Sequence, residues 1–216
     1  MNIPQVFLDT NIIKFSSSEL ERYVPYEQEI SWGGSKQRLV VHQLESCNPN
    51  DNIKNEELKC EVDLLEAVSK LGNDGQLQFL THAEVHFESW NMPNLDSKRG
   101  IFYGANVSLV EDPIQYSRTI MGGGHSLRES QYTFLSSVKH PRFIEIQKVV
   151  GAYQGEMNPP SRNQLLDAFH LWCAENSKCD YFLTLDLKLI KLIRRKANNC
   201  LTVKAIKPSE LLEIVV

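Results

Sequence analysis

The sequence predicts an α/β protein of three layers, in which helices cover both faces of a mainly parallel sheet. Short apolar runs alternate with amphipathic segments along the chain, which is the order typical of a parallel sheet with helical crossovers. Two of the runs, Val6–Leu8 and Tyr181–Leu183, are apolar at consecutive positions, and Thr184 ends the second. That pattern indicates strands buried on both faces.

The first strand is expected at Val6-Phe7-Leu8, directly before Asp9-Thr10-Asn11. Aspartate is unfavourable inside a strand, so this strand should end at Asp9. The carboxyl ends of the strands are where ligands bind in open α/β sheets, which places the Asp9 carboxylate beside a crevice. The alternative is that Asp9 only caps the turn that follows.

The next segment is less regular. A short helix is expected around Glu19–Tyr23, and residues 25–50 are expected to form an insertion because proline, paired glycines and an Asn/Asp cluster interrupt them. Within it, Arg38–His42 fits either a short strand or the start of a helix. From Asn52 to Leu71 apolar residues recur at helical spacing, with Glu and Lys between them.

A strand at Leu77–Leu80 and a helix from Ala83 to about Trp90 are expected next. Thr81 with Glu84 three residues later forms a capping-box pattern at the start of this helix. Glu88 lies four residues after Glu84, so both glutamates project from one helical face.

Residues 91–160 are expected to be a second insertion, helical around Ser126–Val138 and Pro141–Tyr153.

The last third is the most regular part of the chain. It is predicted to alternate between helix and strand in the order Asn163–Asn176 (helix), Cys179–Thr184 (strand), Leu187–Ala197 (helix), Leu201–Ile206 (strand) and a final helix from Pro208. We therefore expect one domain over residues 1–216 with insertions at about 25–50 and 91–160.

Composition limits the class of protein. The 216 residues are 42% hydrophobic and 23% charged, with a net charge of −4, which is ordinary for a globular protein. No apolar stretch is long enough to cross a membrane, and the N-terminus lacks a signal-peptide pattern. The five cysteines are an odd number without metal-binding spacing, which indicates reduced thiols and a cytoplasmic location.

Four acidic positions stand out. Asp9 and Asp186 follow predicted strands, Glu88 or Glu84 lies on the helix after the second strand, and Asp167 interrupts an apolar helical stretch. A carboxylate such as Asp167 must be paired, hydrogen-bonded or metal-bound, because an isolated buried charge is very costly. Clustered carboxylates repel one another unless a cation neutralises them, and ligands that are all oxygen favour Mg²⁺ or Mn²⁺ over zinc.

The chain resembles the PIN-domain nucleases in three stretches that occur in the family's order. They are Val6–Asn11, then Asn163–His170 followed by Cys179–Asp186, and the tail Val203–Leu212 with its proline-led last helix. Together with Leu77–Trp90, the resemblance covers about 120 residues. The distance from Asp9 to the helical glutamate and the length of residues 91–160 both exceed those of compact toxin-type members.

The resemblance implies a metal-dependent ribonuclease that hydrolyses RNA phosphodiester bonds. Asp9, Asp167 and Asp186 would bind Mg²⁺ or Mn²⁺, with Glu88, in preference to Glu84, as the fourth acid. It further implies that Asn11 and Thr184 give supporting hydrogen bonds, and that Asp180, at the start of its strand, is a secondary acid that supports the site. By analogy with toxin members it also suggests an antitoxin-like protein partner, and a homodimer is a further expectation.

Substrate phosphates require basic residues near the acids. Lysines and arginines follow Asp186 on one predicted helix and are the expected substrate-binding residues, or else a solvated amphipathic face: Lys188, Lys191, Arg194, Arg195. His170, three residues after Asp167, either reaches substrate or is a buried, hydrogen-bonded histidine.

Three alternatives remain open. The first is a PIN-like domain that has lost activity and binds RNA or protein. The second is a phosphatase of the haloacid dehalogenase type, although that family requires Asp where this chain has Asn11. The third is a zinc site built from His82, His86 and His125, for which no cysteine has the right spacing.

Overall fold

The computed structural model describes residues 3–16, 20–89, 101–117, 125–153, 155, 158–196 and 200–215. Its centre is a five-stranded sheet in which every pair of neighbouring strands is parallel, in the order β5-β4-β1-β6-β7. The strands are β1 (Gln5–Leu8), β4 (Gln78–Thr81), β5 (Val107–Leu109), β6 (Tyr181–Leu183) and β7 (Lys204–Ile206). The predicted α/β fold with a parallel sheet is therefore confirmed.

Strand β1 is the middle of the sheet. Val6, Phe7 and Leu8 are fully buried, and Phe7 lies opposite Leu80 of β4 and Phe182 of β6. Successive side chains enter different cores, because Phe7 belongs to one apolar cluster while Val6 and Leu8 belong to another. An apolar run without alternation is what burial on both faces requires.

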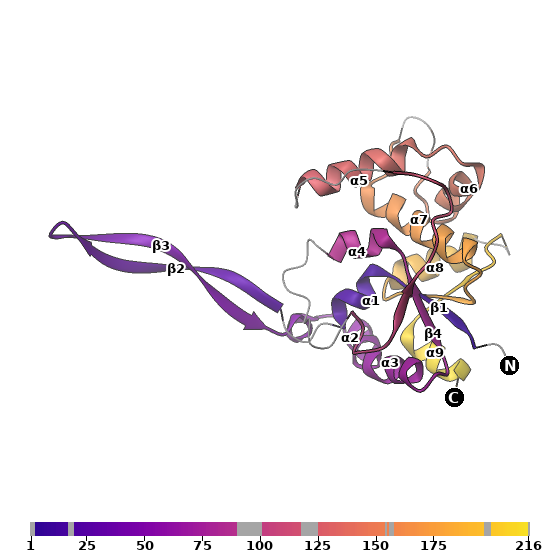
Figure 1. The fold of residues 1–216 in the computed structure, drawn as a ribbon, viewed down its shortest axis with the longest axis horizontal. Helices are drawn as coiled ribbons and strands as arrows, with labels where there is room; N and C mark the ends of the chain where they lie inside the picture. The colour runs from indigo at the N-terminus through magenta and orange to yellow at the C-terminus, as the bar shows by residue number, and fades with distance from the viewer. Residues whose placement is uncertain are drawn as a thin grey trace.

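Helices cover both faces of this sheet (Figure 1). The cluster around Phe7 contains buried residues of α4 (Ala83–Ser89), α5 (His125–Ser137), α6 (Pro141–Val149), α7 (Arg162–Asn176) and α8 (Leu187–Lys196). The cluster around Val6 and Leu8 contains residues of α2 (Glu56–Asp63), α3 (Leu65–Asn73) and α9 (Pro208–Val215). The short helix α1 (Thr10–Phe15) contributes Ile12 to one cluster and Ile13 to the other.

Helix α7 is the most buried of these elements. Ser161 and Gln164 form a reciprocal capping box at its start. Every residue from Leu165 to Ala174 in this fully described helix is buried except Asp167. The apolar run therefore fixes the helix in the core, while Asp167 alone in that run reaches a partly open surface.

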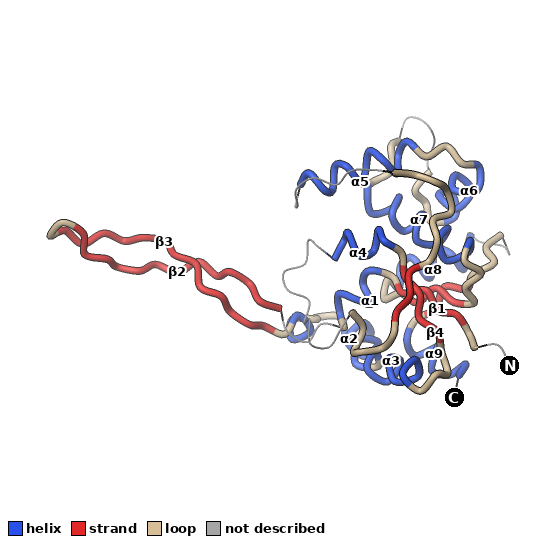
Figure 2. The backbone as a smooth tube through the Cα atoms, viewed as in Figure 1, coloured by secondary structure: helices blue, strands red, loops and turns tan. Residues whose placement is uncertain are grey.

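Two long strands, β2 (Leu20–Trp32) and β3 (Ser35–Cys47), form a separate antiparallel hairpin that projects from the body of the molecule (Figures 1 and 2). Gly33 and Gly34 turn the chain with φ values of +61° and +84°, which a two-residue hairpin turn favours. The predicted helix at Glu19–Tyr23 is wrong over its described residues, Leu20–Tyr23, because β-formers such as Tyr23 and Val24 favour the strand there. The predicted insertion at 25–50 corresponds to this hairpin.

Residues 91–160 contain both predicted helices, as α5 and α6. They also contain β5, which extends the sheet and which the sequence did not reveal because three residues are too few for a periodic pattern. The predicted helix 52–71 is two helices, α2 and α3, that meet at Leu64, preceded by a 3-10 turn at Pro49–Asn52. Trp90, expected to end α4, lies outside the described residues.

No helix within the described part of the chain has the length and apolar character needed to cross a bilayer.

Candidate active site

The strand order places a crevice between β1 and β6. The chain moves from β1 to β4 and β5 on one side of the sheet, and then returns past β1 to β6 and β7 on the other side. In open parallel sheets the point where this direction reverses leaves a crevice at the carboxyl ends of the strands. Asp9 directly follows β1, and Thr184, Leu185 and Asp186 directly follow β6.

Asp9 is 5% exposed and firmly held. Its Oδ1 accepts a hydrogen bond from the backbone N–H of Thr10 at 2.8 Å, and its Oδ2 accepts one from the Thr184 hydroxyl at 2.7 Å. Its own backbone N–H donates to the carbonyl of Leu183, which continues the ladder between the two strands. Asp9 thus caps α1, as its position after the strand predicts, and also faces the crevice.

Asn11 and Thr184 join the two strand ends. The fully buried Thr184 hydroxyl accepts hydrogen bonds from Asn11 Nδ2 at 2.9 Å and from the backbone N–H of Asp186 at 3.0 Å. Asn11 Oδ1 accepts from the backbone N–H of Leu185 at 2.9 Å. These bonds hold Asp9 and Asp186 at a fixed separation, which is the supporting arrangement expected for Asn11 and Thr184.

Asp186 begins helix α8. Its Oδ1 accepts hydrogen bonds from the backbone N–H groups of Lys188 and Leu189, both at 2.9 Å. The bonds satisfy free N–H groups of the first helical turn and fix the carboxylate at the carboxyl edge of the sheet.

Asp167 lies beside Asp9 and Asp186, and the effects that disfavour its negative charge outweigh the one that favours it. No described residue donates a hydrogen bond to its carboxylate. Burial, followed by the negative charges of Asp9, Asp186 and Glu88, raises the pKa of Asp167 to about 8, against a smaller opposing effect of His170. The carboxylates expected from the sequence therefore lie close enough to repel one another.

Glu88 on α4 is the fourth acid of this group. Its Oε2 accepts a hydrogen bond from the Thr10 hydroxyl at 2.5 Å, and its Oε1 lies 3.3 Å from Arg162 Nη2. Glu84, one turn earlier, is fully buried and accepts hydrogen bonds from Tyr116 at 3.1 Å and Gln131 at 2.8 Å. The geometry favours Glu88 over Glu84 as the acid that faces the crevice.

Arg162 is a site residue that sequence reasoning missed. Its guanidinium is held by Gln131 Oε1 at 2.8 Å and Asn163 Oδ1 at 3.1 Å while it pairs with Glu88. A sequence signal was available, because an arginine in the first turn of a helix opposes the helix dipole and therefore requires another partner.

His170 lies beneath the acids, one turn after Asp167. It is 1% exposed, its Nδ1 is 3.5 Å from Asp9 Oδ1, and neither ring nitrogen has a hydrogen-bond partner among the described residues. Burial acts to lower its pKa, but the surrounding carboxylates of Asp9, Glu88 and Asp167 outweigh this and raise it. His170 is therefore a buried histidine whose closest charged neighbours are the acids.

Asp180 is a correction to the predicted site. It precedes β6 and accepts a hydrogen bond from the backbone N–H of Gln5 at 2.8 Å, at the amino end of β1. The four residues from Asp180 to Thr184 span about 13 Å of extended chain. Asp180 therefore lies at the amino ends of the strands, whereas the other acids lie at their carboxyl ends. It supports the start of two strands rather than the acidic group.

The basic residues of α8 differ in their surroundings. Lys188, Lys191 and Arg195 are exposed, whereas Arg194 pairs with both carboxylate oxygens of Glu210, at 2.8 and 2.6 Å. At about 1.5 Å per residue, Arg195 lies about 13 Å along the helix from Asp186. Lys188 is the nearest, and with Asp186 and Asn11 it lines an open groove of about 360 Å³.

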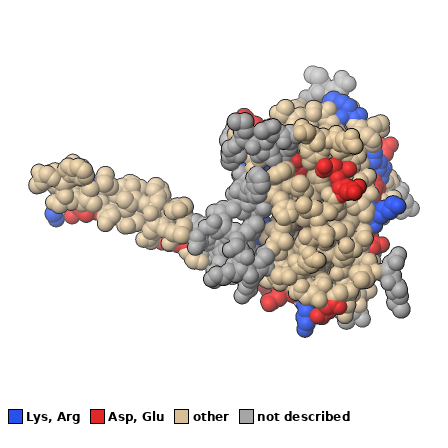
Figure 3. All heavy atoms as spheres, viewed as in Figure 1, with Lys and Arg blue, Asp and Glu red and all other residues tan. Residues whose placement is uncertain are grey.

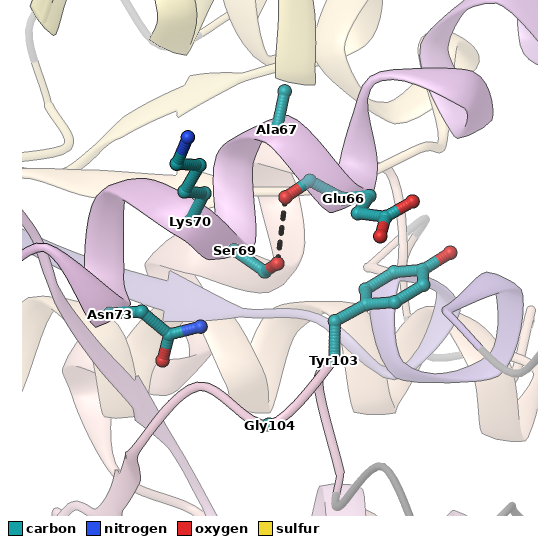
Figure 4. Close-up of a pocket in the computed structure, with 7 residues that line it drawn as sticks. All are labelled: Glu66, Ala67, Ser69, Lys70, Asn73, Tyr103 and Gly104. Carbon is teal, nitrogen blue, oxygen red and sulfur yellow. Dashed lines mark hydrogen bonds between the residues drawn. The ribbon is translucent and has the colours of Figure 1, made fainter.

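A larger groove of about 650 Å³ lies elsewhere, between α3 and residues 103–104 (Figure 4). It contains one acid and one base, Glu66 and Lys70, with Tyr103 opposite Glu66. Ser69 donates its hydroxyl to the carbonyl of Glu66, so the helix uses this polar group itself. The groove brings together no cluster of catalytic groups, and we assign the candidate site to the acids despite its greater volume.

Within the described residues, no three His, Cys, Asp or Glu side chains are already arranged around one point as metal ligands. His82 does not form the zinc alternative, because its Nε2 lies 2.6 Å from Asp112 and its Nδ1 accepts from the backbone of Glu84. The side chain of His125 lies outside the described residues. The oxygen-only donors of the acidic group fit Mg²⁺ or Mn²⁺, since a cation would remove the repulsion that raises the pKa of Asp167.

Neither the protein-family models nor the curated proteins contain a match to this sequence. The description of this protein therefore rests on its fold and its candidate site alone. It is a parallel α/β protein with an acidic group at the point where the strand order reverses.

Proposed function

We propose that this protein is a Mg²⁺- or Mn²⁺-dependent ribonuclease. The observation that carries the proposal is geometric: the Thr184 hydroxyl joins Asp9 to the backbone of Asp186, and the Thr10 hydroxyl joins Glu88 to the residue after Asp9. Asp167 lies near enough to these three acids for their charges, together with burial, to raise its pKa. A fold has no need of such an arrangement, because it costs stability unless a cation is bound. The motif stretches that resemble PIN-domain nucleases supply three of the four acids.

Asp9, Asp167, Asp186 and Glu88 would hold the metal. A bound divalent ion supplies a Lewis acid that polarises a phosphate and lowers the pKa of coordinated water. Thr184 and Thr10 orient Asp9 and Glu88 by donating hydrogen bonds to oxygens of those carboxylates. Such supporting bonds fix the direction in which ligand oxygens point.

Substrate binding requires positive charge beside the acids, because the chain as a whole is acidic. Lys188 lines the groove next to Asp186, and Lys191 follows one turn later. Arg162 already lies beside the acids, and its guanidinium would release Glu88 and bind a phosphate oxygen of the substrate instead. RNA as the substrate follows from the PIN resemblance, and an antitoxin-like partner remains a prediction.

The second candidate is an inactive PIN-like module that binds RNA or protein. The ion pair between Arg162 and Glu88 favours it, because the guanidinium takes up one acid of the group. The phosphatase alternative receives no such support. Asn11 stands at the position of the required acid and is bonded to Thr184 and Leu185.

The test is a Mn²⁺ titration by calorimetry together with an RNA cleavage assay, on wild type, Asp167→Asn and Asp180→Asn. The two variants carry the same substitution, one on α7 among the acids and one just before the start of β6. We expect binding and cleavage in wild type and Asp180→Asn, and loss of both in Asp167→Asn.

Wild-type protein that binds no metal at millimolar concentration would exclude the nuclease and leave the inactive module. Equal loss in both variants would show that the acidic group has no special role.

A further inference from the structure

A chain of hydrogen bonds connects a buried glutamate of α4 to Arg162 at the acids. Glu84 Oε2 accepts a hydrogen bond from Gln131 Nε2 at 2.8 Å, and Gln131 Oε1 accepts one from Arg162 Nη1, also at 2.8 Å. The other guanidinium nitrogen, Nη2, lies 3.3 Å from Glu88 Oε1. Arg162 is therefore held from two sides, by an amide on α5 and by an acid of the candidate site.

The two ends of the Gln131 amide face partners of opposite kinds. An ionised carboxylate only accepts hydrogen bonds and a guanidinium only donates them, so one orientation of the amide serves both, with Nε2 toward Glu84 and Oε1 toward Arg162. Glu84 and Gln131 are both fully buried, where a polar group without a hydrogen bond would be costly. The buried pair therefore presents a fixed acceptor to Arg162.

The contact with Gln131 matters because Glu88 is the fourth acid of the proposed metal site. When Glu88 binds a metal ion, its pair with Arg162 weakens, since the two positive charges repel each other. The bond from Nη2 to Asn163 is exposed to water and holds the guanidinium less firmly. The bond from Nη1 to Gln131 is part-buried and uses neither Glu88 nor the metal, so it keeps Arg162 beside the crevice.

Positive charge beside the acids is scarce. The chain has a net charge of −4, and on the face of the molecule in Figure 3 the described lysines and arginines form no broad basic surface. On α8, Arg194 is paired with Glu210. Binding of a substrate phosphate at the crevice therefore depends on a few cations, and Arg162 is in direct contact with one of the acids.

We propose that Gln131, oriented by Glu84, is a positioning residue that holds Arg162 at the crevice when Glu88 binds metal, so that the freed Nη2 receives a phosphate oxygen of the substrate. This inference rests on the proposed metal-dependent ribonuclease activity and names the residues that prepare its substrate site. The alternative is that the network only joins α5 to α7, in which case its loss would lower stability and leave substrate binding unchanged.

The first test compares two variants that each remove one hydrogen bond from the same carboxylate. Gln131→Met keeps the length of the side chain and breaks the connection to Arg162. Tyr116→Phe removes the hydroxyl that donates to Glu84 Oε1 at 3.1 Å and leaves that connection intact. In Mn²⁺-dependent cleavage of a single-stranded RNA oligonucleotide, Gln131→Met should raise KM about tenfold, as for the loss of one hydrogen bond to a charged group, with kcat unchanged. Tyr116→Phe should leave both unchanged.

Calorimetry should give the same Mn²⁺ affinity for wild type and both variants, because neither substitution touches a carboxylate of the metal site. Circular dichroism verifies that each variant is folded. The stability lost with one hydrogen bond to Glu84 is common to the two variants, so a difference in KM between them reports the connection to Arg162.

A second measurement requires neither metal nor cleavage. Rotation about the Cζ–Nε bond of arginine exchanges Nη1 and Nη2, so a firmly held guanidinium gives two nitrogen NMR signals and a free one gives a single averaged signal. The signals of Arg162 are identified by their absence in Arg162→Lys. We expect two signals in Glu88→Ala, where Gln131 still holds Arg162, and one averaged signal when Gln131→Met is added.

The two measurements separate failure of this inference from failure of the proposed function. An averaged signal in Glu88→Ala, an unchanged KM in Gln131→Met, or an equal rise of KM in Tyr116→Phe would each overturn the positioning role, even in an active nuclease. Wild type that neither binds Mn²⁺ nor cleaves RNA would refute the ribonuclease and this use of Arg162 together, whatever the NMR signals show of the hold on its guanidinium.

Discussion

Helix α7 carries two carboxylates in opposite electrostatic states. Glu175, in its last turn, accepts hydrogen bonds from Arg142 Nε at 2.6 Å and Nη2 at 2.5 Å and from the backbone of Thr202 at 3.0 Å. Burial acts to raise its pKa, but these bonds outweigh burial and the pKa falls below its usual value. Asp167, two turns earlier, has no such donor, and its pKa rises to about 8.

The contrast distinguishes an acid whose charge stabilises the fold from an acid whose charge destabilises it. Arg142 on α6 and Thr202 before β7 tie Glu175 to two other elements, so its charge holds the end of α7 in place. Asp167 faces like charges from β1, α4 and the end of β6. An uncompensated group of this kind is the usual mark of a functional site rather than of a structural one.

The largest predicted effect on stability comes from Glu175→Gln. It leaves the half-buried Arg142 without its main partner, and we expect a loss of about 3 kcal/mol in the free energy of unfolding, the lower end for breaking a buried pair. Urea unfolding measures this. Glu145→Gln is the matched control, because the exposed Glu145 binds the same arginine and should cost less than about 0.5 kcal/mol. Equal losses would remove the distinction between the two ends of α7.

The next effect has the opposite sign. Burial and three other acids disfavour the charge of Asp167, so at pH 7 this carboxyl must take up a proton when the protein folds. Asp167→Asn removes that cost and should stabilise the metal-free protein at pH 7 by about 2 kcal/mol, roughly half of what the pKa shift implies at full value. The folded-state pKa is about 8 and the unfolded value 3.8, so the folded protein binds the extra proton between these values. Wild-type stability should therefore rise as pH falls from about 8 to about 4 through Asp167.

This pH dependence can be isolated by subtraction. The difference in unfolding free energy between Asp167→Asn and wild type should be largest above pH 8 and vanish below about pH 4, where Asp167 is protonated in both states. Glu175 contributes in the opposite direction, because its lowered pKa gives stability above about pH 4.5 that is lost at lower pH. A difference that stays constant with pH would show that Asp167 is not in an acidic group.

A third, smaller effect concerns how the acids are held. Thr184→Val keeps the shape but removes the hydroxyl that joins Asp9, Asn11 and the backbone of Asp186. We expect a loss of about 1.5 kcal/mol and a 10–100-fold fall in metal affinity, as for other groups that orient ligands. Thr81→Val is the matched control on β4, since buried Thr81 makes one long hydrogen bond of 3.4 Å to Leu8. Unchanged Mn²⁺ affinity in Thr184→Val would contradict this role.

The sequence was informative where local rules and tertiary structure agree. Strand β1, helix α7 and strand β6 are apolar because they are buried, and acids at their ends or in their midst are visible as exceptions. Asp9 and Asp186 converge because parallel strands share one carboxyl end. Asp167 reaches them from the middle of helix α7, where it stood out as the one acid in an apolar stretch. Hence these three acids could be predicted together from the sequence.

The sequence was silent or misleading where long-range pairing decides. The hairpin strand through Leu20–Tyr23 depends on partners more than 20 residues away, and β5 is three residues whose pairing with β4 alone makes them a strand. Arg162 joined the site through Glu88, 74 residues earlier. Asp180 was assigned to the site through the PIN resemblance, as a secondary acid at the strand start, and the extended strand β6 separates it in space from Asp186.

The smallest predicted effect tests that last correction. Asp180→Asn keeps an acceptor for the backbone N–H of Gln5 but removes the charge, and because Asp180 is exposed we expect a change of about 0.5 kcal/mol or less. Mn²⁺ affinity, measured by calorimetry, should equal that of wild type. A clear loss of affinity would place Asp180 in electrostatic contact with the acids across the length of β6, and would mean that the two edges of the sheet are not independent sites.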